Sequence, residues 1–265
     1  MAIVAPTATK EELRGRILTA VKEMYTDVAS CPTKTFHFPT GRTACEYVGY
    51  PAEELNKIPA AVLESFAGVG CPFKANVIQQ GDTILDVGSG SGTDLQIAAF
   101  KTGPKGKVYG LDMTDAMIEK AKANFSTMNH ENISIIKGNA ESIPLPNDTI
   151  DVVTSNGVIN LVPDKQLVFQ EIFRVLKRGG CMQIADIVLG SDLSEKSRNN
   201  PQLWAECIVG AMPEENYVSI IKEAGFDSVT VLERIDYFKN SANDSTRNVA
   251  RQYGAISIVL EARKP

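Results

Sequence analysis

Metal-binding side chains are scarce in this chain of 265 residues. It has only two histidines, His37 and His130, which is too few for an imidazole-rich metal centre. Its five cysteines are widely spaced and odd in number: Cys31, Cys45, Cys71, Cys181 and Cys207. They form no C-x-x-C pair, so neither a disulfide framework nor a zinc site is indicated. We therefore expect no resident metal ion.

Basic charge and long apolar segments are also lacking. The net charge of −5 does not supply the basic surface that nucleic-acid binding usually requires. No apolar run approaches the length of a membrane span, and the first residues contain no apolar core of a signal peptide. The sequence therefore predicts a cytoplasmic protein that binds neither nucleic acid nor a membrane. It leaves the choice between monomer and homodimer undetermined.

Strand and helix patterns alternate between residues 76 and 265. This alternation predicts a single α/β core, with a Rossmann-like doubly wound sheet that is mostly parallel and has one antiparallel edge strand. Residues 1–75 are expected to form an N-terminal helical cap or lid. Within it, Lys10–Ala29 has helical spacing, whereas Cys31–Gly49 shows no clear period and is predicted to be irregular. The polar segment Asn240–Arg251 gives no indication of its conformation.

A glycine-rich loop follows the first strand of the predicted core. Thr83–Val87 has the pattern of a buried strand, and three glycines come after it at alternate positions: Gly88, Gly90 and Gly92. Glycines allow the backbone to turn tightly and to bring its N–H groups close to a ligand. Thr93 or Asp94 is expected to cap the next helix. A second strand then ends at Asp112, where a carboxylate can accept hydrogen bonds from two ribose hydroxyls.

A missing glycine and an additional acidic residue indicate which ligand this loop binds. The dinucleotide pattern G-x-G-x-x-G needs a third glycine where this chain has Thr93, and the acidic Asp86 precedes the loop. A carboxylate beside a helix N-terminus suits a cation better than a pyrophosphate. S-adenosylmethionine carries an ammonium and a sulfonium and has no phosphate. A nicotinamide enzyme is a less favoured alternative.

The pattern D-x-G-x-G-x-G, followed by a strand that ends in Asp112, resembles the cofactor loop of class I S-adenosylmethionine-dependent methyltransferases. The resemblance implies S-adenosylmethionine as the cofactor. In this fold the turn Gly138–Glu141 would lie beside the adenine. The implied cofactor-binding residues are Asp86, Gly88, Ser89, Gly90, Gly92, Asp112, Met113, Asn139, Ala140, Glu141 and Asn156.

A narrower resemblance extends over roughly Tyr47–Ala224. The segments LDVGSGSGTD, SNGVINLVPDK and VFQEIFRVLKRGG, together with Cys207–Ala211, are similar to arsenite S-adenosylmethionine methyltransferases. Residue by residue, Cys71 and Cys207 match two of the family's cysteines, while Cys45 aligns less clearly with a further one. The resemblance implies thiolates that hold thiophilic trivalent arsenic while its lone pair attacks the methyl group.

One departure from the arsenite methyltransferase pattern affects the substrate. The family's cysteine in SNCVINL is Gly157 here, so a cage of three thiolates is incomplete, although a pre-methylated arsenical needs only two. Two alternatives therefore stay open. One is methylation of another small carbon, oxygen or sulfur nucleophile, and the other is a non-catalytic protein that binds S-adenosylmethionine or a thiophilic ion.

The candidate catalytic residues are Cys71, Cys207 and His37. His37 lies in the aromatic segment Phe36–Phe38 and is a candidate substrate contact or base. Each assignment has an ordinary alternative, since free cysteines are usually small buried hydrophobic residues and histidines are commonly found in loops. For Cys181, at the start of a predicted strand, the buried structural role is favoured.

Overall fold

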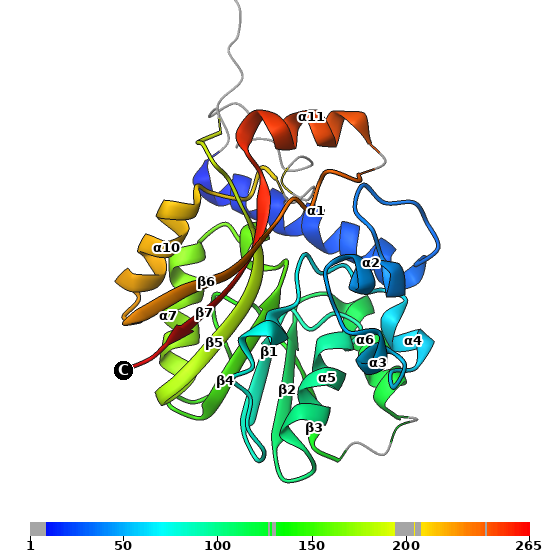
Figure 1. Cartoon of the computed structure of the whole chain (residues 1–265), viewed down its shortest axis with the longest axis vertical. Coiled ribbons are helices and arrows are strands. Elements are labelled where there is room, and N and C mark those ends of the chain that lie inside the picture. The colour runs from blue at the N-terminus through cyan, green and yellow to red at the C-terminus, as the bar shows by residue number, and fades with distance from the viewer. Residues whose placement is uncertain (1–8, 127, 129–130, 194–203, 205–207, 242) are drawn as a thin grey trace, which may run out of the picture.

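A seven-stranded sheet with helices on both faces forms the centre of the molecule (Figure 1). The structure is a computed structural model that describes residues 9–126, 128, 131–193, 204, 208–241 and 243–265. The strands are β1 (Thr83–Val87), β2 (Lys107–Asp112), β3 (Ile133–Lys137), β4 (Ile150–Asn156), β5 (Leu176–Val188), β6 (Ser228–Ile235) and β7 (Ile256–Arg263). Their order across the sheet is β3-β2-β1-β4-β5-β7-β6.

The sheet confirms the predicted fold class. Strands β1 to β5 pair in parallel, and β7 pairs antiparallel with both β5 and β6, between which it lies. The strand order reverses at β1, because β2 lies on one side of it and β4 on the other. In open α/β sheets a ligand binds at such a switch point, beyond the carboxyl ends of the strands.

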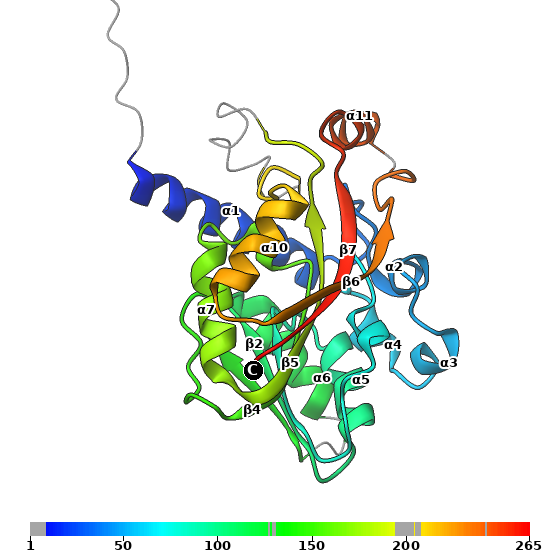
Figure 2. The same ribbon diagram turned by 60° about the vertical axis from the view of Figure 1, so that its left-hand side comes forward.

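Helices cover the two faces of the sheet separately (Figure 2). The helices α5 (Thr93–Thr102) and α6 (Asp115–Ser126) pack on one face, and α7 (Lys165–Val175) and α10 (Glu214–Glu223) pack on the other. The apolar stripe of α6 is buried, and it consists of Met117, Ile118, Ala121 and Phe125. Burial of such a stripe is what fixes an amphipathic helix on a sheet.

Between residues 9 and 75 lie four α-helices, α1 (Lys10–Ser30), α2 (Gly41–Tyr47), α3 (Ala52–Leu55) and α4 (Ala60–Leu63), and the short 3-10 helix Pro72–Ala75. A capping box begins α1, because the Thr9 hydroxyl accepts from the Glu12 N–H while the Glu12 carboxylate accepts from the Thr9 N–H. Ile17 of α1 and Leu95 of α5 belong to the same apolar cluster. The cap and the sheet thus share a core, and a domain boundary at residue 75 stays a prediction.

Two local predictions were wrong. The segment expected to be irregular contains α2, a helix of 7 residues whose buried positions are too few to display a period. The N-cap of α5 is Gly92, at φ 104°, and neither Thr93 nor Asp94 takes that role.

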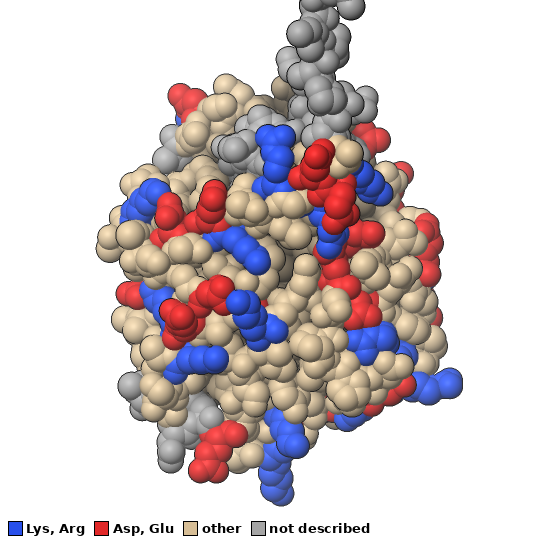
Figure 3. All heavy atoms as spheres, turned by 180° about the vertical axis from the view of Figure 1, so that it is seen from behind, with Lys and Arg blue, Asp and Glu red and all other residues tan. Residues whose placement is uncertain are grey.

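The polar segment whose conformation the sequence left open forms α11 (Asp244–Tyr253). The Asn243 side chain caps it by accepting from the Ser245 N–H at 2.9 Å, and Gly254 ends it with a positive φ of 62°. Acidic and basic side chains are interspersed on the face shown in Figure 3. Within the described residues, no helix combines the length and the apolar character needed to cross a membrane.

Candidate functional site

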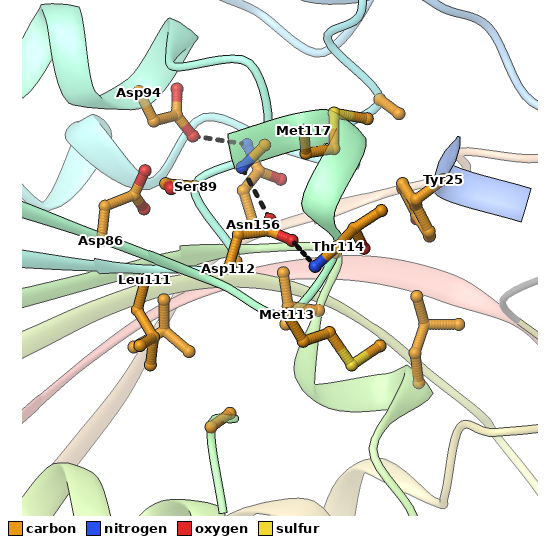
Figure 4. A pocket seen from close by; sticks show the side chains of 18 of the residues that line it. Tyr25, Asp86, Ser89, Asp94, Leu111, Asp112, Met113, Thr114, Met117 and Asn156 are labelled. Atoms are coloured by element: carbon orange, nitrogen blue, oxygen red, sulfur yellow. Dashed lines mark hydrogen bonds between the residues drawn. The ribbon is translucent and has the colours of Figure 1, made fainter. Parts of the chain in front are cut away.

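A cavity opens at the carboxyl ends of β1, β2 and β4, where the switch point places it (Figure 4). The glycine loop after β1 lines it, and Leu18, Val21 and Tyr25 of α1 form another part of its wall. Among the predicted cofactor-binding residues, those that line the cavity are Asp86, Gly88, Ser89, Gly90, Asp112, Met113, Asn139, Ala140 and Asn156.

The glycine loop is held against β2 by its own backbone. The N–H groups of Gly88 and Ser89 both donate to the Leu111 carbonyl, at 2.7 and 3.0 Å. Gly88 has a φ of 75°, and a Cβ atom there would lie 2.2 Å from Val158 Cγ2. Only glycine therefore allows the loop to lie this close to the segment that follows β4.

Asp112 at the end of β2 is fixed by two backbone donors. Its Oδ1 accepts from the Thr114 N–H at 2.8 Å, and its Oδ2 accepts from the Gly90 N–H at 2.9 Å. Burial raises the pKa of this carboxyl group, while those two hydrogen bonds lower it. A carboxylate held in this way presents its remaining lone pairs to the cavity, which suits the hydroxyl donors of a ribose.

Two further carboxyl groups, Asp86 and Asp94, line the same cavity and are buried. Asp86 Oδ1 accepts from the Thr154 hydroxyl at 2.7 Å, whereas Asp86 Oδ2 is buried with no hydrogen-bond partner among the described residues. Burial raises the pKa of Asp86, and the negative charge of Asp94 raises it further. Among the described residues that line the cavity, none is a lysine or an arginine. The cavity therefore favours a cationic ligand and disfavours phosphates, which fits S-adenosylmethionine.

Asp94 is the residue of this site that the sequence analysis assigned to another role. Its Oδ1 accepts from the Tyr50 hydroxyl at 2.6 Å, and its Oδ2 accepts from the Asn156 amide at 3.1 Å. Burial raises the pKa of Asp94 to about 6, although both of these hydrogen bonds lower it. The position of Asp94 just after the glycine loop could have indicated a role in the ligand site. Its partner Tyr50 lies in the cap, and nothing in the sequence indicated that the two side chains meet.

Two predicted cofactor-binding residues do not line the cavity in this structure. Gly92 is the N-cap of α5. The Glu141 carboxylate is turned toward α1, where it accepts from the Arg14 guanidinium, with Nη1 at 2.6 Å from Oε1. It also accepts from the Asp164 N–H at 3.1 Å. Glu141 therefore ties α1 to the turn that holds Asn139 and Ala140, and a direct cofactor contact for it stays a prediction.

Cys71 ends a short segment, Gly68–Cys71, that we call the thiol turn. Gly68 lines the cavity, whereas the Cys71 side chain is buried and is not among the lining residues. Burial raises the pKa of the Cys71 thiol to about 12, and the negative charge of Asp94 adds to this shift. Burial and Asp94 also raise the pKa of Cys45. Both thiols thus lie within the electrostatic reach of a cavity-lining carboxylate.

Of the other two candidate catalytic residues, His37 is not among those that line the cavity. Cys207 lies outside the described residues. His37 is largely buried, its ring packs edge-on against Phe38 at 4.6 Å, and its Nε2 has no hydrogen-bond partner among the described residues. Burial lowers the pKa of His37 to about 4. Phe38 in turn stacks on Tyr25, so His37 is one ring removed from the cavity wall.

Gly157 lines the cavity with a φ of 69°, and a Cβ atom there would lie 3.2 Å from Val69 Cγ1. A side chain at this position would therefore be strained and would press on the thiol turn. Across the described residues, no group of three or more His, Cys, Asp or Glu side chains is arranged to hold a metal ion.

The two buried carboxyl groups lead to a pH-dependent prediction. The pKa of Asp94 is higher in the folded than in the unfolded protein, so its ionisation destabilises the ligand-free fold as the pH rises from about 4 through about 6. Asp94→Asn removes this ionisation. We therefore expect the free energy of unfolding of the variant, minus that of the unchanged protein, to be about 1–2 kcal/mol larger at pH 7.5 than at pH 5. Urea unfolding of both proteins at both pH values measures these free energies. The same stability difference between variant and unchanged protein at pH 5 and at pH 7.5 would contradict the prediction.

Comparisons with known proteins agree with this geometry. A family model described as a methyltransferase domain matches residues 78–225. The chain is 33% identical to an arsenite methyltransferase of Halobacterium salinarum, with 85% of this chain and 57% of that protein covered. It is 31% identical to an arsenite methyltransferase of Mus musculus, with 80% and 55% covered. The chain thus spans about half the length of these curated relatives.

Solved structures give the same result. The crystal structure of an arsenic(III) S-adenosylmethionine methyltransferase from Chlamydomonas reinhardtii matches with a TM-score of 0.67 and 31% identity, over 80% of this chain and 72% of that chain. A phosphoethanolamine N-methyltransferase of Haemonchus contortus, in complex with S-adenosyl-L-methionine, matches with a TM-score of 0.61 and 18% identity over 84% and 60%. At that identity the second match shows a shared fold alone.

Proposed function

Because this chain belongs to the class I S-adenosylmethionine-dependent methyltransferases, close to the arsenite methyltransferases, we propose that it methylates a small thiophilic acceptor. Trivalent arsenicals are the leading candidates. The family resemblance predicted from the glycine loop and from SNGVINLVPDK is confirmed.

The observation that carries the proposal is the position of the thiol turn beside a cation-favouring cavity. Asn156, which lines the cavity, accepts from the N–H groups of Val69 and Gly70 at 2.8 and 3.3 Å, and Cys71 follows directly. Gly68 of the same turn lines the cavity, which supports a role for the soft Cys71 sulfur as a ligand of the acceptor near the space that the cofactor would occupy. Trivalent arsenic is thiophilic, and thiolate sulfur is the ligand such an ion prefers.

Different residues of the cavity would bind different groups of the cofactor. When bound, S-adenosylmethionine supplies a methyl group that its sulfonium charge makes electrophilic. Asp86 and Asp94 would balance the cationic groups of the cofactor, and Asp112 would accept from its ribose hydroxyls. The α1 side chains exclude water from the cavity, and methyl transfer otherwise needs orientation rather than acid–base groups.

Cys71 would act as a ligand of the acceptor. Its thiol is protonated at neutral pH, so it would bind by exchange: the sulfur replaces a hydroxide on arsenic, and the thiol proton leaves with that hydroxide as water. The arsenic atom keeps its lone pair and remains a soft nucleophile. Gly157 supplies no sulfur at the cavity wall, so we expect an already methylated arsenical to be preferred over arsenite.

A second candidate function is methylation of a small carbon, oxygen or sulfur nucleophile. The cavity wall around Gly157 favours it, because Ala67, Val158, Leu161 and Val162 give that end an apolar lining. Such a lining suits an uncharged organic acceptor.

One turnover experiment separates these candidates. The purified chain is incubated with S-adenosylmethionine and a panel of arsenite, a monomethylated trivalent arsenical, small thiols, phenols and carboxylic acids. Mass spectrometry then measures the release of S-adenosylhomocysteine. We expect the monomethylated arsenical to give the fastest release. Turnover of an organic acceptor without turnover of any arsenical would favour the second function, and no release with any acceptor would favour a non-catalytic binding protein.

A further inference from the structure

We propose that Tyr50, Asp94 and Asn156 couple the cofactor cavity to the thiol turn, so that each ligand strengthens the binding of the other. In this role Tyr50 and Asn156 are positioning residues. The inference rests on the proposed function, because it takes a thiophilic acceptor as the occupant of the thiol turn.

The Asn156 side chain connects the two sites directly. Its Oδ1 accepts from the Val69 and Gly70 N–H groups of the thiol turn. Its Nδ2 donates to the Gly70 carbonyl at 2.9 Å, to the Tyr50 hydroxyl at 2.9 Å and to Asp94 Oδ2 at 3.1 Å. One amide therefore joins the thiol turn to a carboxylate that lines the cavity.

The Asn156 amide has fewer hydrogens than it has acceptors, and this shortage explains why a ligand at Asp94 would strengthen the thiol turn. An amide nitrogen carries two hydrogens, yet Asn156 Nδ2 faces three acceptors, so at least one of these hydrogen bonds is shared. The Tyr50 hydroxyl cannot relieve the shortage, because it donates its single hydrogen to Asp94 Oδ1. A cationic ligand beside Asp94 would satisfy that carboxylate, and both Asn156 hydrogens could then go to Gly70 and Tyr50.

Close packing would carry this change to the thiol turn. A Cβ atom on Gly68 would lie 2.4 Å from Asn156 Nδ2, and one on Gly70 would lie 2.7 Å from the Ala185 Cβ. The turn therefore lies in direct contact with the amide on one side and with β5 on the other. Because packed interiors do not deform continuously, a change in the Asn156 hydrogen bonds alters how firmly the turn is held.

Tyr50 is itself held rigidly within the cap. Its ring is buried and packs edge-on against Phe66, before the thiol turn, and against Phe73, after it, at 5.3 and 6.3 Å. Its N–H donates to the Cys45 carbonyl at 3.0 Å. The Tyr50 hydroxyl thus has a fixed position from which to hold Asp94.

Calorimetry on the full chain tests the coupling without turnover. The probes are S-adenosylhomocysteine, which cannot donate a methyl group, and phenylarsine oxide, which binds protein thiols. We expect saturating phenylarsine oxide to tighten S-adenosylhomocysteine binding about tenfold, and the reverse titration to give the same factor, because coupling free energies are reciprocal. In Tyr50→Phe both probes should still bind, with a coupling factor near one.

Tyr217→Phe is the matched control. Tyr217 is also a buried tyrosine whose hydroxyl donates to a buried carboxylate, Asp186 Oδ2, at 2.6 Å, but it belongs to the apolar cluster on the other face of the sheet. It should keep the tenfold factor. If Tyr50→Phe does not fold, Asn156→Asp removes the donated hydrogens and should give the same loss of coupling.

The outcomes separate the two proposals. A factor near one in the unchanged protein, or a tenfold factor that survives in Tyr50→Phe, overturns the coupling and leaves the proposed function intact. Failure of phenylarsine oxide to bind at all overturns both, because no thiophilic site would then exist.

Discussion

Replacing Cys71 with serine is expected to weaken the binding of a trivalent arsenical by at least about 100-fold and to abolish its turnover, because a hard hydroxyl replaces the soft sulfur that arsenic prefers. The affinity for S-adenosylhomocysteine should change by less than about threefold, since a conservative change outside the cofactor cavity alters few of its contacts. Cys71 is not among the cavity-lining residues. Calorimetry with phenylarsine oxide and with S-adenosylhomocysteine measures both effects.

Cys181→Ser is the control for this substitution. Cys181 is also buried, but it lies within β5 opposite Val152, nearer the amino end of β4 than the cavity is. It should leave the affinity for both ligands unchanged. Full arsenical turnover by Cys71→Ser would mean that Cys71 is not a ligand of the acceptor.

Gly88→Ala is expected to abolish measurable cofactor binding. The added Cβ would lie 2.2 Å from Val158 Cγ2, so either the glycine loop or the segment after β4 must move, and both line the cavity. Overpacking of this kind costs about 1–3 kcal/mol, and a non-glycine residue in the left-handed region costs about 1–2 kcal/mol more. Calorimetry measures the loss of binding, and urea unfolding measures the loss of stability.

Gly179→Ala separates backbone strain from the clash. Gly179 has the same φ of 75° as Gly88, but a Cβ atom there would meet nothing within 4 Å. It lies in the irregular first part of β5. This variant should lose about 1–2 kcal/mol of stability and should bind S-adenosylhomocysteine normally. Normal cofactor binding by Gly88→Ala would mean that the loop does not line the cofactor site.

The sequence predicted the elements whose signals are local. The strand Thr83–Val87 and the glycines after it predicted the sheet, the position of the cavity and the cationic character of its ligand. The apolar stripe of α6 was equally readable, because helical spacing requires only neighbouring residues. Asp86 and Asp112 could be proposed from the sequence because Asp86 is the penultimate residue of β1 and Asp112 is the last residue of β2, both at the switch point.

The hydrogen-bond network of the site was not readable, because its members are distant along the chain. The Tyr50 hydroxyl bonds to Asp94, 44 positions away, and to the Asn156 amide, 106 positions away. Glu141 likewise turns to Arg14, 127 positions away, where the motif alone suggested a ligand contact. Only the tertiary fold brings such partners together. From the local sequence alone, an acidic residue after a glycine loop is interpreted as a helix cap, as happened with Asp94.

The ion pair between Arg14 and Glu141 has a consequence for how fast the nucleoside can be exchanged. Helix α1 supplies Leu18, Val21 and Tyr25 to the cavity wall and is fastened at Arg14 to the turn beyond β3. Loss of this ion pair would leave that part of the cavity wall held by the packing of α1 against α6. We therefore expect the rate at which S-adenosylhomocysteine dissociates to depend on α1. Its affinity should depend on the carboxylates at the strand ends.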